Sequence, residues 1–270
     1  MRKTLLYGFL GLFALLQLFP LVWLANFSLL KAGDFFGGDV LKWPNPAQWI
    51  NYQNAVKYGH VVAYFWHSLV VAVLVVFLTC LLALTMGYAF SRMRWKWRGA
   101  ILNVILIGMM IPLHATLLPN FEIFHKRGLT DKLWALVLPN IAFNLPVAIF
   151  VVTGFLQTLP KELEEAAVMD GCSVFQLLLS VIRPLAANAL ATVAVMTFIA
   201  TWNEFIMANT YLMSEKWKTL PFSIIQFNGQ YSANYGAQFA VMTIIAVPSI
   251  LFYLLFTERM KQGVMAGTIK

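Results

Sequence analysis

The side chains that could perform catalysis or bind a metal are few and scattered along this sequence. The four histidines and two cysteines show none of the spacings at which such residues bind zinc together. No glycine-rich loop followed by a lysine and a serine or threonine, the pattern that cradles nucleotide phosphates, occurs in the chain. The sequence therefore predicts no catalytic residue, no metal site and no ATPase site of its own.

One polar segment, residues 159–184, has residue types in the order that a helix, a bend and a second helix require. Pro160 suits the first position of a helix. Negative charge near the positive end of the helix dipole follows at Glu162, Glu164 and Glu165. Gly171 can adopt the left-handed conformation that ends a helix. Ser173 and Gln176 have the spacing of a capping box, so a second helix is expected to start there and lead to Pro184, where the next apolar segment begins.

The first of these two helices could bind another protein. Ala166 and Ala167 leave one side without bulk, so a partner surface could approach closely. Glu164, Glu165 and Asp170 offer carboxylates to arginine or lysine on that partner. The residues alone are equally compatible with an amphipathic helix that lies on the membrane surface.

A second group of polar residues lies inside apolar runs. Glu204 is the only charged residue deep within such a run, and a carboxylate there either faces a water-filled path or forms a structural hydrogen bond between helices. Trp202 and Asn203 precede it and offer an aromatic face and an amide to a polar solute. Successive helical residues point about 100° apart, so at most two of the three can face one path. Asn144 is a further candidate, with a helix-kink cap as the alternative.

These residues are set among apolar segments that must position them. Hydrophobic residues make up 60% of the chain and charged residues 11%, whereas soluble domains carry about 25% charge. A helix needs about 20 mostly apolar residues to cross a membrane. Six segments meet this need: 5–27, 68–90, 100–118, 133–156, 185–212 and 239–256. We expect an all-α membrane protein with a single transmembrane domain over residues 1–270.

The positive charges predict the orientation of this domain. With a cytoplasmic N-terminus, the inner segments hold eleven of the 19 lysines and arginines and the outer segments hold eight. The turn from Ser91 to Arg98 contains four cations and two tryptophans, which suits the inner membrane surface. Both termini and the 159–184 loop are therefore expected in the cytoplasm. The net charge of +8 is explained by lysines and arginines that lie between apolar segments and face the membrane surface. No nucleic-acid partner is therefore expected.

The loop resembles a known motif. Its Glu165-Ala-Ala-x-x-x-Gly171 run, followed by Pro184, is similar to the signature loop of bacterial ABC importer permeases, although Arg183 stands where leucine is usual. Trp202-Asn-Glu-Phe and the tail from Gly263 through Gly267 to Lys270 resemble the carbohydrate-uptake permeases of the maltose type, closest to their second permease subunit.

This resemblance implies a bacterial multi-pass membrane protein that is no enzyme. In that family the loop forms a coupling helix in a groove of the ATPase, and the tail with Gly263 and Gly267 reaches the ATPase subunits. The implied partners are a second, similar permease chain, two ATP-binding subunits that hold ATP and magnesium, an extracytoplasmic binding protein and membrane lipid. No cofactor is expected in this chain. The alternatives are a secondary transporter driven by an ion gradient, or an ABC permease for glycerol phosphate, amino acids or peptides.

Overall fold

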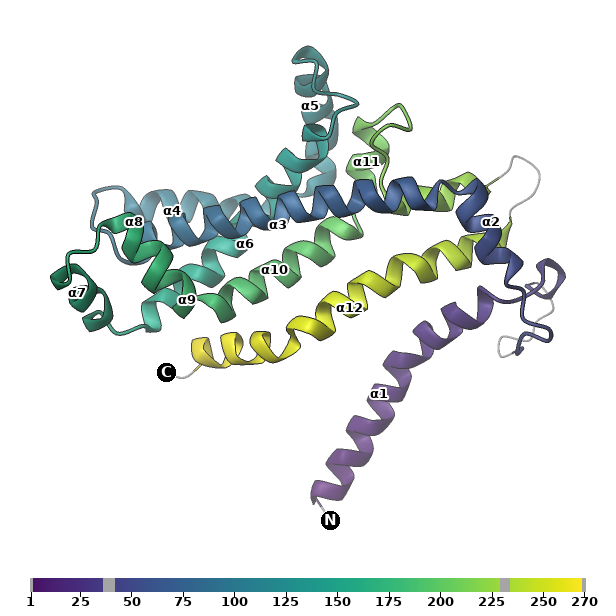
Figure 1. The fold of residues 1–270 in the computed structure, drawn as a ribbon, viewed down its shortest axis with the longest axis horizontal. Helices are drawn as coiled ribbons and strands as arrows, with labels where there is room; N and C mark the ends of the chain where they lie inside the picture. Colours follow the sequence, from purple (N-terminus) through teal and green to yellow (C-terminus); the bar gives the residue numbers. More distant parts are fainter. Residues whose placement is uncertain (1, 36–41, 229–233, 269–270) are drawn as a thin grey trace. The chain divides into compact units, whose positions relative to one another are not determined.

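A computed structural model describes residues 2–35, 42–228 and 234–268, and their regular structure is helical (Figure 1). The chain divides into two compact units. Unit 1 comprises residues 1–66 and 219–248, and unit 2 comprises residues 67–218 and 249–270. The helices α3 and α12 each run through both units.

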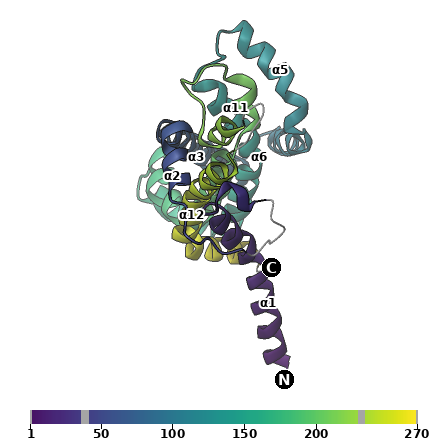
Figure 2. The ribbon, with the colours of Figure 1, turned by 90° about the vertical axis from the view of Figure 1, so that its right-hand side faces the viewer.

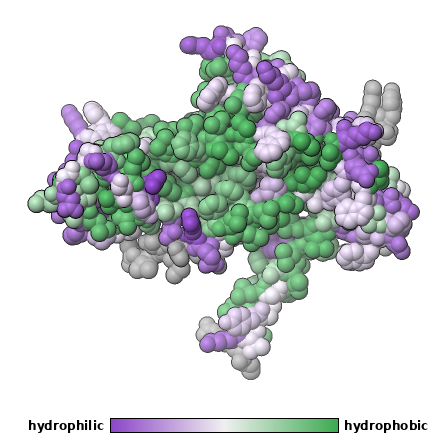
Figure 3. All heavy atoms as spheres, in the orientation of Figure 1, coloured by the Kyte–Doolittle hydropathy of each residue, from purple (hydrophilic) through white to green (hydrophobic). Residues whose placement is uncertain are grey.

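In the described parts of the chain, four helices are long and apolar enough to cross a membrane. They are α1 (Arg2–Phe27), α3 (Val61–Ser91), α6 (Trp134–Thr158) and α12 (Tyr235–Thr268). Four of the six predicted segments coincide with these continuous helices. Figure 3 shows hydrophobic side chains over the middle of α3 and hydrophilic ones gathered on the loops. The prolines within α1, α6 and α12 do not end these helices.

The predicted span 100–118 is not one straight helix. It consists of α4 (Arg98–Ile107), a 3-10 turn η2 (Gly108–Met110) and α5 (Leu113–Lys126), and the chain bends by 101° at the break. Pro112 explains the break, because proline disfavours the helical conformation of the residue before it. Ile111 is accordingly extended, with ψ 115°.

The predicted span 185–212 is also interrupted. Its main helix is α10 (Ala187–Trp202), followed after a short break by α11 (Ile206–Tyr211). The helical segment 174–185 precedes α10 and meets it at 77°. Among the described residues, four helices could span a membrane, or up to six if each bent pair counts as one span.

Unit 1 is held by buried polar and aromatic contacts. It contains α1, η1 (Ala32–Asp34), α2 (Ile50–Tyr58), η4 (Leu220–Phe227) and the first part of α12. The buried Asn51 amide of α2 donates hydrogen bonds to the carbonyls of Ser28 and Leu30, both at 2.9 Å. Phe27 packs on Phe239 with ring centroids 5.3 Å apart, so α2 and α12 both fix the end of α1.

Unit 2 is built around α3, α6 and α10, whose small and aliphatic side chains form a common core. A second core lies under α5 and α11, which are beside each other in both views (Figures 1 and 2). Phe124 of α5 and Tyr211 of α11 meet edge to face there, with ring centroids 5.3 Å apart.

Asp131 joins the two loops next to this second core. Its own N–H donates to the carbonyl of Tyr211, and its carboxylate accepts the N–H groups of Met213 and Ser214 at 2.9 Å each. Burial raises the pKa of the Asp131 carboxyl, but the hydrogen bonds from Ser214 and Met213, with Lys218 nearby, outweigh it and hold that pKa below its ordinary value. The ionised form therefore stabilises this loop pair.

Candidate functional site: the loop between α6 and α10

The loop after α6 folds as two short helical segments around a bend. The first is α7 (Glu162–Met169), which begins two residues later than the predicted start at Pro160. Gly171 has φ +83°, which confirms the left-handed residue at the bend. The capping box between Ser173 and Gln176 is present, with Ser173 N–H donating to Gln176 Oε1 at 2.9 Å. Local sequence chemistry therefore determines this turn.

The chain after the bend does not lead directly into the next long helix. It continues through α8 (Val174–Gln176), the π-helical segment η3 (Leu177–Ile182) and α9 (Arg183–Leu185). Pro184 lies in α9 and is exposed, whereas α10 starts only at Ala187. The prediction that Pro184 begins the membrane helix is wrong by three residues, because a break at Ala186 separates the two segments.

One arginine attaches this loop to the rest of unit 2. Arg92, at the end of α3, donates from Nη2 to the carbonyls of Leu156 and Leu159 at 2.5 and 2.6 Å. Its Nε lies 2.8 Å from Oε1 of Glu164, and the two side chains are only 7% and 15% exposed. Tyr88 donates its hydroxyl to the other oxygen of Glu164 at 3.3 Å. We call this set of contacts the Arg92 clamp.

The Arg92 clamp has a clear electrostatic basis. The carbonyls at the end of α6 carry its negative dipole end, which favours a guanidinium; that of Leu156 also accepts the N–H of Leu159 at 3.2 Å. Glu164 supplies a full negative charge beside it, so the buried cation is neutralised. The clamp therefore joins the ends of α3 and α6 to the first turn of α7.

The two predicted alanines of α7 differ in burial. Ala167 is only 8% exposed and packs with Leu177, Leu178 and Ile182 in the core of unit 2. Ala166 is exposed together with Glu165 and Asp170. Of the two, only Ala166 can therefore present a surface to a partner; the inference that Ala167 shares this surface does not fit its burial. Glu164 likewise faces inward, to Arg92.

Apolar residues beside the bend complete the outer side. Met169 is 87% exposed and Phe175 is 70% exposed, and Leu163, Val168 and Val174 are exposed as well. Carboxylates at Glu162, Glu165 and Asp170 surround them. We call these eight residues with Ala166 the loop face. The sequence analysis did not predict the apolar members of this face. Met169 and Phe175, which stand on either side of the Gly171 bend, could have indicated them.

The polar residues around the end of α10 are used in different ways. Trp202 is only 1% exposed and stacks on Phe198 with centroids 5.4 Å apart, so its face is not open to a solute. The carboxylate of Glu204 accepts the N–H groups of Met207 and Ala208 and so caps α11. Asn203 is exposed and donates to the carbonyl of Ile199 at 2.9 Å.

Asn144 of α6 lies apart from this turn. Its amide donates to the carbonyl of Asn140 at 2.8 Å, one turn back between the two prolines of the helix. It also lines a hollow of about 150 Å³ between α6 and α10, together with Thr197. Asn144 and Asn203 are thus the predicted path residues with polar atoms still accessible.

The predicted tail residues Gly263 and Gly267 belong to α12, which continues as a helix to Thr268. Residues 269 and 270 lie outside the described residues. Within the described parts of the chain, no three histidine, cysteine, aspartate or glutamate side chains come together in a way that could hold a metal ion.

Comparisons with known proteins agree with this architecture. The family model described as "Binding-protein-dependent transport system inner membrane component" matches residues 79–264, which include the whole loop between α6 and α10. The trehalose/maltose transport system permease protein MalG of Thermococcus litoralis is 30% identical over 96% of this chain and 94% of its own length. The sulfoquinovosyl glycerol transport system permease protein SmoH of Agrobacterium fabrum is 30% identical over 94% of this chain and 89% of its own.

A solved structure shares the fold. A chain of a bacterial ABC transporter involved in the import of the acidic polysaccharide alginate superimposes with a TM-score of 0.80. It covers 96% of this chain and 98% of its own length, at 22% sequence identity. A chain of the MetNI methionine ABC transporter in inward-facing conformations gives a TM-score of 0.58 over 75% of this chain and 95% of its own, at 19% identity.

Proposed function

This chain belongs to the family of binding-protein-dependent transport system inner membrane components, the permease subunits of ABC importers, and we propose that the solute it carries is a carbohydrate. The similarity to permeases named for trehalose/maltose and sulfoquinovosyl glycerol transport supports this substrate class. The accessible amides of Asn144 and Asn203 can donate to and accept from sugar hydroxyls.

We further propose that the loop face is the docking surface for an ATP-binding subunit. The observation that carries this proposal is an exposed apolar patch with carboxylates around it, standing on a helix that the Arg92 clamp fixes to α3 and α6. Exposed Met169 and Phe175 would anchor in an apolar groove, and Glu165 and Asp170 would pair with cations beside it. A movement of the ATPase would then reach two long helices directly.

The complete transporter that we propose contains this chain, a second similar permease, two ATP-binding subunits and an extracytoplasmic binding protein. ATP and magnesium would be bound by the ATPase subunits and not by this chain. The apolar side chains of α1 from Leu5 to Val22 are exposed, which suits lipid or the second permease. The end of α12, with Gly263 and Gly267, is proposed as a second contact with the ATPases.

The proposed topology has six spans with both termini in the cytoplasm. It counts the bent pair of α4 and α5 as one span and the segment 185–212, with α10 as its main helix, as another. The Arg92 clamp supports it, because the cationic turn after α3 contacts the loop that would face the ATPase. The positive-inside rule assigns that turn to the cytoplasm, so the loop lies there too.

Uptake assays in cells that lack the chromosomal gene would test the substrate class. Labelled trehalose, maltose, glycerol 3-phosphate, an amino acid and a dipeptide should be compared, each with and without a proton-gradient uncoupler. We expect only a sugar to accumulate in a manner that needs this chain. Uptake of a non-sugar solute alone would overturn the substrate class, and uptake that stops with the uncoupler while ATP is held constant would favour a secondary transporter.

A further inference from the structure

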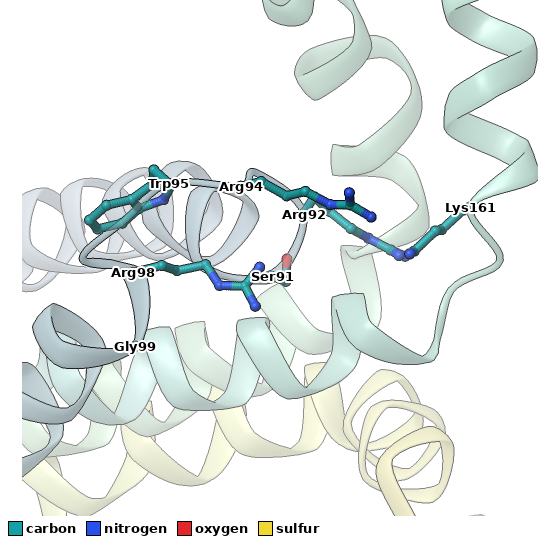
Figure 4. A pocket seen from close by; sticks show the side chains of 7 residues that line it. All are labelled: Ser91, Arg92, Arg94, Trp95, Arg98, Gly99 and Lys161. Atoms are coloured by element: carbon teal, nitrogen blue, oxygen red, sulfur yellow. The ribbon is translucent and has the colours of Figure 1, made fainter.

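A cationic hollow lies at the end of α3, apart from the loop face. Its volume is about 540 Å³, and it is lined by residues of the α3–α4 turn and of the loop after α6: Ser91, Arg92, Arg94, Trp95, Arg98, Gly99 and Lys161. Figure 4 shows Arg92 and Arg94 extending from one segment toward the side from which Lys161 extends. Four of the seven lining residues are cations and none is acidic, so the hollow is suited to an anion.

Within the residues that the structure describes, one of these cations has an acidic partner. Arg92 belongs to the clamp and is paired with Glu164. Among the described residues, Arg94, Arg98 and Lys161 form no ion pair, and Arg98 donates only to the carbonyl of Met93 at 3.2 Å. Guanidinium groups bind phosphate oxygens in pairs, and an ammonium adds a point charge. These groups form a site for a phosphate of one or two negative charges.

The surroundings of the hollow indicate where that phosphate comes from. The hollow opens between the last turn of the apolar helix α3 and the first turn of α4. Trp95 and Trp97 are exposed beside it, as is usual at the level of lipid headgroups. Ile101, Val104 and Ile107 are exposed along α4 at a spacing of three residues. A soluble phosphate would use none of this apolar surface, whereas acyl chains would lie along it.

We propose that this hollow binds the headgroup phosphate of an anionic phospholipid, with its acyl chains along α4. Arg94, Arg98 and Lys161 contact the phosphate, and Trp95 covers the glycerol side. Gly99 leaves the wall open, because a Cβ atom at this position would meet no atom within 4 Å. Since Arg92 also lines the hollow, a bound lipid would lie against the clamp that holds α7.

Native mass spectrometry of the full-length chain in dodecyl maltoside can test this site, with dioleoyl phosphatidylglycerol as the anionic probe and dioleoyl phosphatidylcholine as the neutral one. The wild-type chain should retain phosphatidylglycerol preferentially. A charge-assisted hydrogen bond to the phosphate contributes roughly tenfold to binding, so Arg94→Gln/Lys161→Gln, which loses two of them, should weaken it about a hundredfold. The matched control Lys96→Gln/Arg183→Gln removes the same charge from positions that do not line the hollow, so it loses no direct contact and should stay within about threefold of wild type.

A second variant separates a loss of lipid binding from a loss of folding. Gly99→Asp puts a carboxylate in the hollow, while an acidic residue in the first turn of α4 favours the helix dipole. It should reduce phosphatidylglycerol binding without lowering the thermal unfolding temperature of the chain. Binding by either hollow variant that equals that of the control would overturn the proposal.

Two further experiments distinguish a bound lipid from a soluble phosphate and from a protein contact. Glycerol 3-phosphate should not displace phosphatidylglycerol at equal concentration, and efficient displacement would assign the hollow to a soluble phosphate. If Arg94→Gln/Lys161→Gln keeps its lipid but no longer co-purifies with an ATPase, the hollow is a protein contact and the lipid assignment fails. Ala166→Trp on the loop face should keep full lipid binding, so failure of the docking proposal would leave this one standing.

Discussion

Replacing Arg92 with glutamine should release α7 from the ends of α3 and α6. The change removes the ion pair with Glu164 and the hydrogen bonds to the carbonyls of Leu156 and Leu159. It also leaves the Glu164 carboxylate, which is only 15% exposed, without its cation. Breaking a buried pair in this way costs about 3–5 kcal/mol. We therefore expect the local opening of α7 to become roughly a hundredfold to a few thousandfold more frequent, at about 1.4 kcal/mol for each factor of ten.

Replacing the other partner of the ion pair, Glu164→Gln, should destabilise α7 less than Arg92→Gln does. Arg92 keeps its two carbonyl acceptors, and the glutamine amide can still accept from Tyr88. The loss of one charge-assisted contact is worth about 1.5–3 kcal/mol, or roughly tenfold to a hundredfold in opening. The variant Arg92→Gln/Glu164→Gln should open no more often than Arg92→Gln alone, because no buried charge is then left unpaired.

Hydrogen exchange of the amides from Glu162 to Met169 measures this opening in the purified chain. Arg94→Gln is the matched control, since it removes a cation from the same turn that has no ion pair among the described residues. Exchange in Arg92→Gln that is no faster than in Arg94→Gln would refute the clamp. So would equal effects of Arg92→Gln and Glu164→Gln, because the carbonyl contacts would then contribute nothing.

Three further predictions follow from the same structure. Ala166→Trp should abolish coupled ATPase activity in the assembled transporter while α7 exchange stays normal, whereas Ala167→Trp should raise that exchange because its side chain enters the core; equal exchange in the two variants would contradict this assignment. A cysteine at Trp95 should escape a membrane-impermeant thiol reagent in intact cells, and one at Ser214 should react; the opposite labelling would invert the topology. The ionised Asp131 stabilises its loop pair above its unfolded pKa of 3.8, and this contribution is lost as pH falls through the lower folded pKa. Asp131→Asn should therefore be less stable than wild type at pH 7, and this difference should disappear as pH falls through the lowered pKa of Asp131; a difference that stays constant into acid would count against the carboxylate.

The bend between α7 and α8 could be predicted because its causes are local. Gly171 needs only its own lack of a side chain to take φ +83°, and Ser173 and Gln176 cap each other three residues apart. The interruption of the third span was only half visible. Pro112 disfavours a helical conformation at Ile111, but the 101° change of direction depends on how α4 and α5 pack.

The candidate path residues show the opposite case. Trp202, Asn203 and Glu204 are adjacent in sequence and looked like one polar turn. The helix ends at Trp202, so the three side chains separate: the indole enters the core, and the carboxylate turns forward to cap α11. Where a helix stops inside an apolar run depends on its neighbours, and no residue type in that run marks the position.

The sequence by itself determined that this is a helical membrane protein, where its longest apolar helices lie, and that a capped bend follows one of them. These properties follow from composition, from the length an apolar helix needs, and from contacts within a few residues. Only the tertiary structure decided which alanine of α7 faces outward and that Arg92 holds Glu164, 72 positions away along the chain. Arg92 and Glu164 form a buried pair because the packing of the helices removes both side chains from water at the same place. That packing depends on the whole fold and not on the residues near either side chain.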